Sequence, residues 1–248
     1  MRAKKLFTNF LSKMGYVLLK KESPYLRIAK GECHSFFDFI IARYLHSNGL
    51  NKQFHFLQIG AHDGQNKDPL AKYTDSCKWH GIMVEPIKSN FSRLSNKYQK
   101  NPNIKVVNCA VAWEQGYKPM YKVSEDCEKA PHWASMIASF SRDHLLNFKS
   151  KFPEIEKHIV IENVECNTIR NIISGHAGND EINLVVIDTE GFDYQVILML
   201  FKGNIEPSIL HCEIAYMSPE EKSELFKMLE NRRYCFAIEG RDLTAYKE

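Results

Sequence analysis

At 248 residues, the chain is long enough for one α/β domain with an appendage. Its hydrophobic fraction of 44% and charged fraction of 25% are those of a globular protein. No apolar run approaches the roughly 20 residues that a membrane-spanning helix needs. Seven cysteines are scattered without a C-x-x-C pair. This pattern argues against a disulfide framework or a structural zinc site, and it indicates a reducing, cytoplasmic location.

The net charge of +3 is unevenly distributed along the chain. Residues 1–30 contain eight Lys or Arg and a single acid, together with an apolar stripe at helical spacing, namely Leu6, Phe7, Phe10, Leu11 and Met14. A basic amphipathic helix is predicted here. We expect it to pack on the protein's own core or on a second copy of the chain, and contact with the anionic inner face of a membrane is the alternative. Without interleaved aromatic and basic residues, no nucleic-acid binding is predicted.

Hydrophobic periodicity predicts strands that alternate with helices. In the first half we expect a helix at 33–48, strands at 54–59, 81–85 and 104–109, and helices at 68–78 and 87–100. Residues 112–158 are predicted to be irregular, with a mixed-charge helix near 141–150. Strands are then expected at 159–165, 182–188, 208–214, 233–239 and 243–246, and helices at 167–175, 192–202 and 219–231. This order predicts a doubly wound, mostly parallel sheet with helices on both faces, of Rossmann type, over residues 51–248, after a helical extension at 1–50.

A glycine loop follows the first strand and reads Gly60-Ala61-His62-Asp63-Gly64. The second strand ends on Glu85-Pro86. A strand, a glycine turn, a helix, and a second strand ending on an acid are typical of sites for nucleotide-like cofactors. The glycines let the backbone approach the ligand, and the acid accepts hydrogen bonds from ribose hydroxyls.

Two cofactors compete for this loop. A dinucleotide usually binds at G-x-G-x-x-G, but the middle glycine is absent here, and Asp63 would repel a pyrophosphate. S-adenosylmethionine has no phosphate and carries cationic groups, so the acidic loop suits it better. A nicotinamide-dependent oxidoreductase remains the weaker alternative.

Polar residues also follow the later strands, at Asn108–Val111, Asp188–Gly191 and His211–Glu213. Ligands of such sheets bind beyond the carboxyl ends of the strands, so we expect Ala110 to flank an adenine ring. Asp188 and Glu190 are two residues apart and would point the same way in an extended backbone. With His211 and Glu213 they could form a Mg²⁺ or Mn²⁺ site, but the spacing does not require it, and no metal is predicted.

These segments together resemble FkbM-type methyltransferases, a family in the class I group that uses S-adenosylmethionine. The similarity runs over about residues 50–240 and is carried by Gln58–Gly64, Val84–Pro86, Asn108–Val111, Val186–Gly191 and Leu210–Glu213. It implies methylation of a hydroxyl on a sugar, a glycan or a secondary metabolite. The family usually has an acid where this chain has Gln58. Asp63 is one replacement for that acid, and a non-catalytic relative that only binds cofactor or a partner is the alternative.

The resemblance and the strand ends together assign the candidate site. The cofactor-binding residues are predicted to be Gly60, Ala61, Asp63, Gly64, Glu85, Pro86, Ala110 and Asp188. Glu190 is the candidate base, Asp188 is expected to place the cofactor or substrate, and Glu213 is a further catalytic candidate. The insertion at 112–158 is expected to select the acceptor, with Trp133 either stacked on a sugar face or buried in a lid.

Overall fold

The computed structural model describes residues 35–48, 53–65, 68–76, 79–176 and 181–247. The chain divides into two units, Met1–Gln53 and Phe54–Glu248. In the first unit, helix α3 (Phe36–Asn48) forms within the range predicted for it. The basic helix predicted for residues 1–30 lies outside the described residues. None of the described helices is both long enough and apolar enough to cross a membrane.

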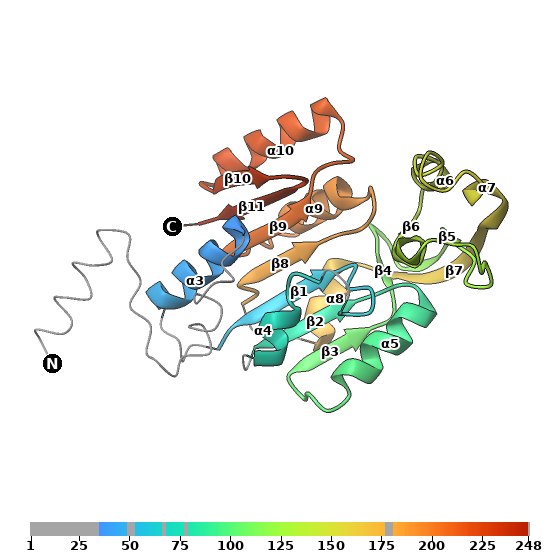
Figure 1. Ribbon diagram of the computed structural model, residues 1–248. Helices are drawn as coiled ribbons and strands as arrows, with labels where there is room; N and C mark the ends of the chain where they lie inside the picture. Colours follow the sequence, from blue (N-terminus) through green and yellow to red (C-terminus); the bar gives the residue numbers. More distant parts are fainter. Residues whose placement is uncertain (1–34, 49–52, 66–67, 77–78, 177–180, 248) are drawn as a thin grey trace, which may run out of the picture. The chain divides into compact units, whose positions relative to one another are not determined.

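The second unit is built on a seven-stranded sheet with the strand order β10-β11-β9-β8-β1-β2-β3 (Figure 1). Neighbouring strands from β3 across to β9 are parallel, whereas β11 is antiparallel to both of its neighbours. The strands are β1 (His55–Ile59), β2 (His80–Val84), β3 (Ile104–Val107), β8 (Leu184–Ile187), β9 (Ile209–Glu213), β10 (Cys235–Glu239) and β11 (Asp242–Tyr246). The predicted doubly wound, mostly parallel sheet is therefore confirmed.

Helices cover both faces of this sheet. Strand side chains alternate between the faces, and every residue of β1 and β8 is buried, so both faces must be covered. The helices of this unit's sheet are α4 (Ala71–Ser76), α5 (Lys88–Tyr98), α8 (Ile169–His176), α9 (Asp193–Lys202) and α10 (Pro219–Asn231). Leu57 and Ile59 of β1 join a core with buried residues of α8, α9 and α10. On the opposite face, Phe56 contacts Trp79, whose ring stacks on Tyr73 of α4 with centroids 4.7 Å apart.

The order of the strands fixes where a ligand can bind. The chain runs from β1 outward to β2 and β3, and it then returns to pair β8 with the other edge of β1. The loops that leave β1 and β8 therefore diverge to opposite sides of the sheet. In open α/β sheets this divergence opens a crevice at the carboxyl ends of the strands.

The irregular conformation predicted for residues 112–158 is wrong. Two strands within this insertion, β5 (Gly116–Val123) and β6 (Ala138–Ser139), join the flanking strands β4 (Ala110–Val111) and β7 (Ile159–Asn167) in a second sheet with the order β4-β7-β5-β6. Pro119, a residue type that usually interrupts strands, lies within β5 opposite Asn163. In the described structure β6 pairs with β5 only at Tyr121 and Lys122, so Pro119 lies at a sheet edge, where proline is tolerated.

Three short helices complete the insertion: η1 (His132–Met136), α6 (Arg142–Leu146) and α7 (Ile155–His158). The helix expected near 141–150 is the shorter α6. These elements share a small apolar core made of Val123, Ala134, Ile137, Leu145, Phe152 and Ile155. The insertion is thus a packed substructure with its own core, and its β4 leads directly from the turn after β3.

Candidate functional site

The carboxyl ends of β1, β2, β8 and β9 open into a cavity of about 490 Å³. The insertion forms part of its wall through Met120, Ile137 and Phe140. The predicted site residues that line it are Gly60, Ala61, Glu85, Pro86, Ala110, Asp188, Glu190 and Glu213. Asp63 and Gly64 are not among the lining residues. Most of the predicted site is therefore gathered around one cavity.

Gly60 turns the chain at the end of β1 with a φ of 83°. A Cβ added to it would lie 1.7 Å from the carbonyl oxygen of Asp188, at the end of β8. Only glycine fits such a close approach in this backbone conformation. The amides of Gly60 and Ala61 both donate to the carbonyl of Val84, at 3.0 and 3.1 Å. The ends of three strands are thereby fixed against one another.

The second half of the glycine loop turns away from the cavity. Gly64 has a φ of 69°, and a Cβ there would lie 2.6 Å from Cδ1 of Leu94 on α5. The Asp63 carboxylate accepts a hydrogen bond from the Gln65 amide at 2.9 Å and lies 3.3 Å from Nδ1 of His62. Gly64 thus packs closely against side chains of α5, and Asp63 contacts groups of its own loop.

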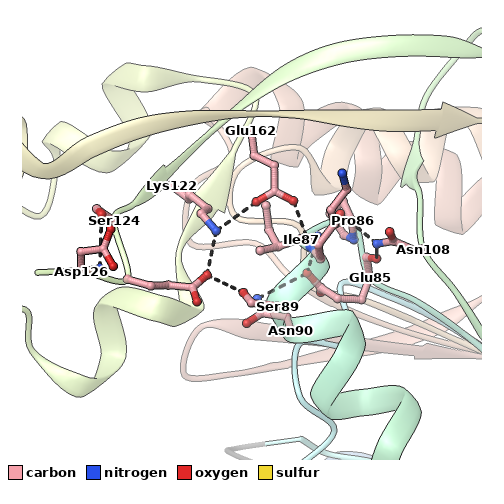
Figure 2. Close-up of polar contacts among 12 residues, drawn as sticks. Glu85, Pro86, Ile87, Ser89, Asn90, Asn108, Lys122, Ser124, Asp126 and Glu162 are labelled. Carbon is pink, nitrogen blue, oxygen red and sulfur yellow. Dashed lines mark hydrogen bonds and ion pairs between the residues drawn. The ribbon is translucent and has the colours of Figure 1, made fainter.

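Glu85 is only 4% exposed at the end of β2. Its Oε1 accepts from the Ile87 amide at 2.9 Å (Figure 2), and its Oε2 accepts from the His62 amide at 2.9 Å. One side chain thus joins the glycine loop to the start of α5. Burial raises the pKa of Glu85 to about 7, although both amide donors oppose the rise. Oε2 retains a lone pair that can accept a further donor.

A polar network ties the insertion to this corner of the site (Figure 2). Lys122 of β5 lies 2.9 Å from Glu162 of β7 and 2.8 Å from Glu125. Glu162 accepts from the Lys88 amide at 3.0 Å, and Ser89 Oγ donates to Glu125 at 2.5 Å. The carboxylates of Glu162 and Glu85 therefore both bind amides at the N-terminus of α5, where the helix dipole stabilises negative charge.

The loop after β8 is not extended, which corrects the backbone predicted for Asp188 and Glu190. Glu190 has a φ of 50° and Gly191 a φ of 92°, so the chain turns sharply at these residues. The carboxylate of Asp193, at the start of α9, holds the turn by accepting from the amides of Thr189 at 3.1 Å and Gly191 at 3.2 Å. Asp188 and Glu190 both line the cavity despite the turn. A left-handed φ at a residue other than glycine is typical of functional loops.

The insertion supplies a histidine that the sequence did not indicate. Nε2 of His144, on α6, lies 2.9 Å from Oε2 of Glu190. Ser139 Oγ donates to the Glu190 carbonyl at 2.8 Å. His144 is only 6% exposed and packs edge-on against the Tyr216 ring, with centroids 4.4 Å apart. His144 therefore positions Glu190 from behind, while Glu190 faces the cavity.

A family model described as the methyltransferase FkbM domain matches residues 58–236, which is most of the chain. The chain belongs to the FkbM methyltransferase domain family. This match confirms the resemblance drawn from the strand-end motifs. The matched range contains every predicted site residue and the whole insertion between β4 and β7.

Solved structures resemble this FkbM chain only in part. The methyltransferase FkbM from Methylobacillus flagellatus KT is 13% identical, with a TM-score of 0.48 over 90% of this chain and 58% of its own. Human methyltransferase 10 domain containing protein is 11% identical, with a TM-score of 0.42 over 79% of this chain and 73% of its own. Aeropyrum pernix fibrillarin, crystallised with S-adenosyl-L-methionine, is 9% identical, with a TM-score of 0.40 over 79% and 66%. No curated protein matches the chain.

Acidic side chains crowd one end of the FkbM cavity. Desolvation by the surrounding protein, followed by repulsion from Glu190, raises the pKa of Asp188 well above its usual range. The Asp188 side chain nevertheless remains accessible from the open cavity. Burial raises the pKa of Glu213 to about 7, although Nε of Arg241 lies 2.6 Å away. Clustered acids of this kind attract a cationic ligand.

Aromatic rings line the part of the cavity that the FkbM insertion forms. Trp133 and Phe148 both line it, with their ring centroids 5.3 Å apart. Tyr216, which follows β9, also lines the cavity and carries the Arg241 guanidinium 4.8 Å above its ring. Trp133 is half-buried, which fits both a ring stacked on a sugar face and a ring buried in a lid. The role of the insertion in selecting the acceptor stays a prediction.

The alternative metal site is not assembled in the described structure. Among those residues there is no group of three or more His, Cys, Asp or Glu side chains placed to hold a metal ion. Nδ1 of His211 instead lies 2.9 Å from the hydroxyl of Thr244 on β11. His211, one of the four donors considered, thus has a partner in the sheet.

Proposed function

We propose that this FkbM domain transfers a methyl group from S-adenosylmethionine to a hydroxyl of a sugar, a glycan or a secondary metabolite. The observation that carries the proposal is the arrangement around one cavity. A close glycine turn and a buried carboxylate with spare acceptor capacity, at Gly60 and Glu85, lie on the same cavity as the acidic loop at Asp188–Gly191. Membership of a methyltransferase family supports S-adenosylmethionine as the cofactor.

The residues present fit this cofactor. Glu85 has acceptor capacity for a ribose hydroxyl, and Pro86 and Ala110 offer flat, apolar surface to an adenine ring beside it. The acids at the ends of β8 and β9 suit its positive charge, and they would oppose the pyrophosphate of a nicotinamide dinucleotide. When bound, S-adenosylmethionine supplies an electrophilic methyl group on a sulfonium.

Glu190 is the residue that we assign as the base. A sugar hydroxyl is a poor nucleophile until its proton is removed, and a positioned carboxylate accepts that proton as the oxygen–methyl bond forms. His144 holds Oε2 of Glu190 at 2.9 Å, which leaves Oε1 to face the acceptor. Asp188 and Glu213 would orient the acceptor, because positioning alone lowers the barrier of such a displacement by several kcal/mol.

The first test is calorimetry of the purified chain with S-adenosylhomocysteine, NAD and NADP. We expect micromolar binding of S-adenosylhomocysteine and no binding of either dinucleotide. Binding of NAD without S-adenosylhomocysteine would overturn the proposal in favour of an oxidoreductase.

The second test follows transfer of a labelled methyl group to a panel of sugars and glycans. Glu190→Gln should abolish transfer while affinity for S-adenosylhomocysteine stays within a few fold, because Glu190 acts on the acceptor. Glu220→Gln, an exposed change in the first turn of α10, is the matched control and should leave both unchanged. Cofactor binding without transfer to any acceptor would favour the non-catalytic alternative.

A further inference from the structure

The insertion contributes almost only apolar side chains to the wall of the cavity. The apolar lining residues include Met120, Trp133, Met136, Ile137, Phe140 and Phe148. Residues 112–158 are all described, and the one charged lining residue among them is Lys151. Apart from Lys151 and the indole N–H of Trp133, no lining side chain of the insertion forms strong hydrogen bonds. A sugar placed against this wall would leave hydroxyls unpaired, which is costly in a buried site. The wall therefore favours an acceptor with an apolar body.

Among the described lining residues, Lys151 carries the only Lys or Arg charge that no acid neutralises. Arg241, the other basic side chain of this kind, lies 2.6 Å from Glu213. Nζ of Lys151 lies 5.8 Å from the centroid of the Phe148 ring and forms no ion pair with any described residue. Its neighbour Lys149, by contrast, pairs with an acid at 3.1 Å. A cation without a counter-charge on a cavity wall attracts an anionic group of a ligand.

The side chains of His144, Phe148 and Lys151 form a row that leads away from the base. The His144 and Phe148 rings are in contact, with centroids 5.6 Å apart. The Lys151 amide donates to the Phe148 carbonyl at 2.9 Å, so the turns continue beyond α6. At about 1.5 Å of rise per residue, Lys151 lies about 10 Å along this path from His144, which holds Glu190. An anion at Lys151 is thus separated from the reacting hydroxyl by an apolar span.

The acids at the other end of the cavity fix the direction in which such an acceptor can bind. Asp188, Glu190 and Glu213 all line that end. They would repel a carboxylate or a phosphate, whereas an uncharged hydroxyl can approach them. The charges of the cavity therefore suit a molecule with its hydroxyl at one end and its anion at the other.

We propose that the acceptor is an anionic amphiphile, a hydroxyl-bearing molecule with an apolar body and a carboxylate or phosphate that pairs with Lys151. This inference rests on the proposed function and narrows its acceptor class. The hydroxyl faces Glu190, the apolar body lies along Phe148 and Trp133, and Lys151 determines the specificity for the anion. A pocket that is mostly apolar, with a few polar groups to orient the ligand, is the usual form of a small-molecule site.

Four probes separate the parts of this acceptor. In 8-hydroxyoctanoic acid an apolar chain joins a hydroxyl to a carboxylate, and 8-hydroxyoctyl phosphate carries the other anion. Octane-1,8-diol removes the charge, and maltose offers hydroxyls without an apolar body. Each is titrated by calorimetry into protein saturated with S-adenosylhomocysteine. We expect the better anionic probe to bind at least about 5-fold more tightly than the diol, and maltose to bind most weakly.

The substitution Lys151→Met keeps an apolar stem and removes the charge. It should lower the affinity for the better anionic probe about 5- to 10-fold and leave that for the diol within about two-fold. Lys149→Met is the matched control, because Lys149 is 58% exposed and pairs with Glu156, and no affinity should change. Lys151→Glu should reverse the preference, so that 8-aminooctan-1-ol binds more tightly than the acid. Lys151 is exposed, so all three variants should keep the melting temperature of the wild type.

The outcomes separate this inference from the proposed function. A wild-type chain that does not bind S-adenosylhomocysteine would overturn both. If it binds S-adenosylhomocysteine but neither anionic probe, or if it binds maltose more tightly than either, only the acceptor class is refuted. Equal affinities of the wild type and Lys151→Met for the anionic probes would show that Lys151 is an ordinary solvated lysine.

Discussion

Glu85→Gln is expected to remove one pH dependence of the protein's stability and to weaken cofactor binding. Glu85 is buried, and its pKa rises from 4.5 to about 7 in the folded chain. A shift of this size corresponds to about 3 kcal/mol at a pH above both values. The folded state therefore holds a proton that the unfolded state has lost between pH 4.5 and 7. The free energy of unfolding consequently falls as the pH rises through this window.

The glutamine variant removes that titration. The NH₂ of the glutamine would replace one of the two oxygens that accept from the His62 and Ile87 amides, which lowers the free energy of unfolding by about 1–3 kcal/mol at every pH. Because the variant carries no buried charge, its free energy of unfolding relative to the wild type should rise by up to about 3 kcal/mol between pH 5 and pH 8. Cofactor binding should show the opposite effect. The carboxylate is the better acceptor for ribose hydroxyls, so affinity for S-adenosylhomocysteine at pH 8 should fall about ten-fold or more.

Urea unfolding followed by circular dichroism at pH 5, 6, 7 and 8 measures the stability difference directly. Other acids of the cavity also titrate, so the difference between wild type and variant is the quantity that reports Glu85. Glu220→Gln provides the same chemical change on an exposed helix turn. Its free energy of unfolding should differ from that of the wild type by the same amount at each pH. A difference for Glu85→Gln that does not change between pH 5 and 8 would refute the reasoning.

Three further predictions concern the framework of the site. Gly60→Ala should lower the free energy of unfolding by about 2–5 kcal/mol, from the positive φ and the clash with Asp188. Gly240 also has a positive φ but open space around it, so Gly240→Ala should lower the free energy of unfolding by only about 1–2 kcal/mol. Equal losses for the two variants in urea unfolding would show that the contact between Gly60 and Asp188 does not matter. His144→Phe should reduce turnover about 10-fold or more with unchanged affinity for S-adenosylhomocysteine; unaltered turnover would exclude a positioning role. Glu162→Gln should lower the free energy of unfolding, measured in urea, by about 1–2 kcal/mol. Glu156 lies in exposed ion pairs, so Glu156→Gln should lower it by less than about 0.5 kcal/mol.

The main sheet could be predicted because each strand carries a local signal. Continuous apolar runs such as Leu184–Ile187 are typical of parallel strands covered on both faces. The start of α10 is marked by a capping box between Ser218 and Glu221 and by Pro219 in the first turn. The insertion was predicted, but its sheet was missed because Gly116 and Pro119 are local breakers. The pairing of β5 with β7 joins residues 36 to 50 positions apart in sequence, and no local pattern records such a pairing.

The candidate site was predictable where function imposes a residue type on a strand end. Gly60 directly follows β1 and Glu85 directly follows β2. His144 contacts Glu190 from a short helix, and Asp68 contacts Gln58 on the cavity wall from a turn, and no spacing rule relates the members of either pair. Asp193 had a usable signal, since it follows a glycine at the first turn of a helix, where an acid commonly binds free amides. Asp63 was assigned from sequence proximity alone, and it does not line the cavity.

The contact between Gly60 and the Asp188 carbonyl bears on inhibitor design. The two loops touch through backbone atoms, with no side chain between them to adjust, so neither can shift without the other. A compound that joins an adenosine to an acceptor mimic would meet two anchoring points at a nearly constant separation. Its affinity should then depend sharply on the length of the connecting chain, and a series of linkers differing by one methylene would act as a molecular ruler for this FkbM domain.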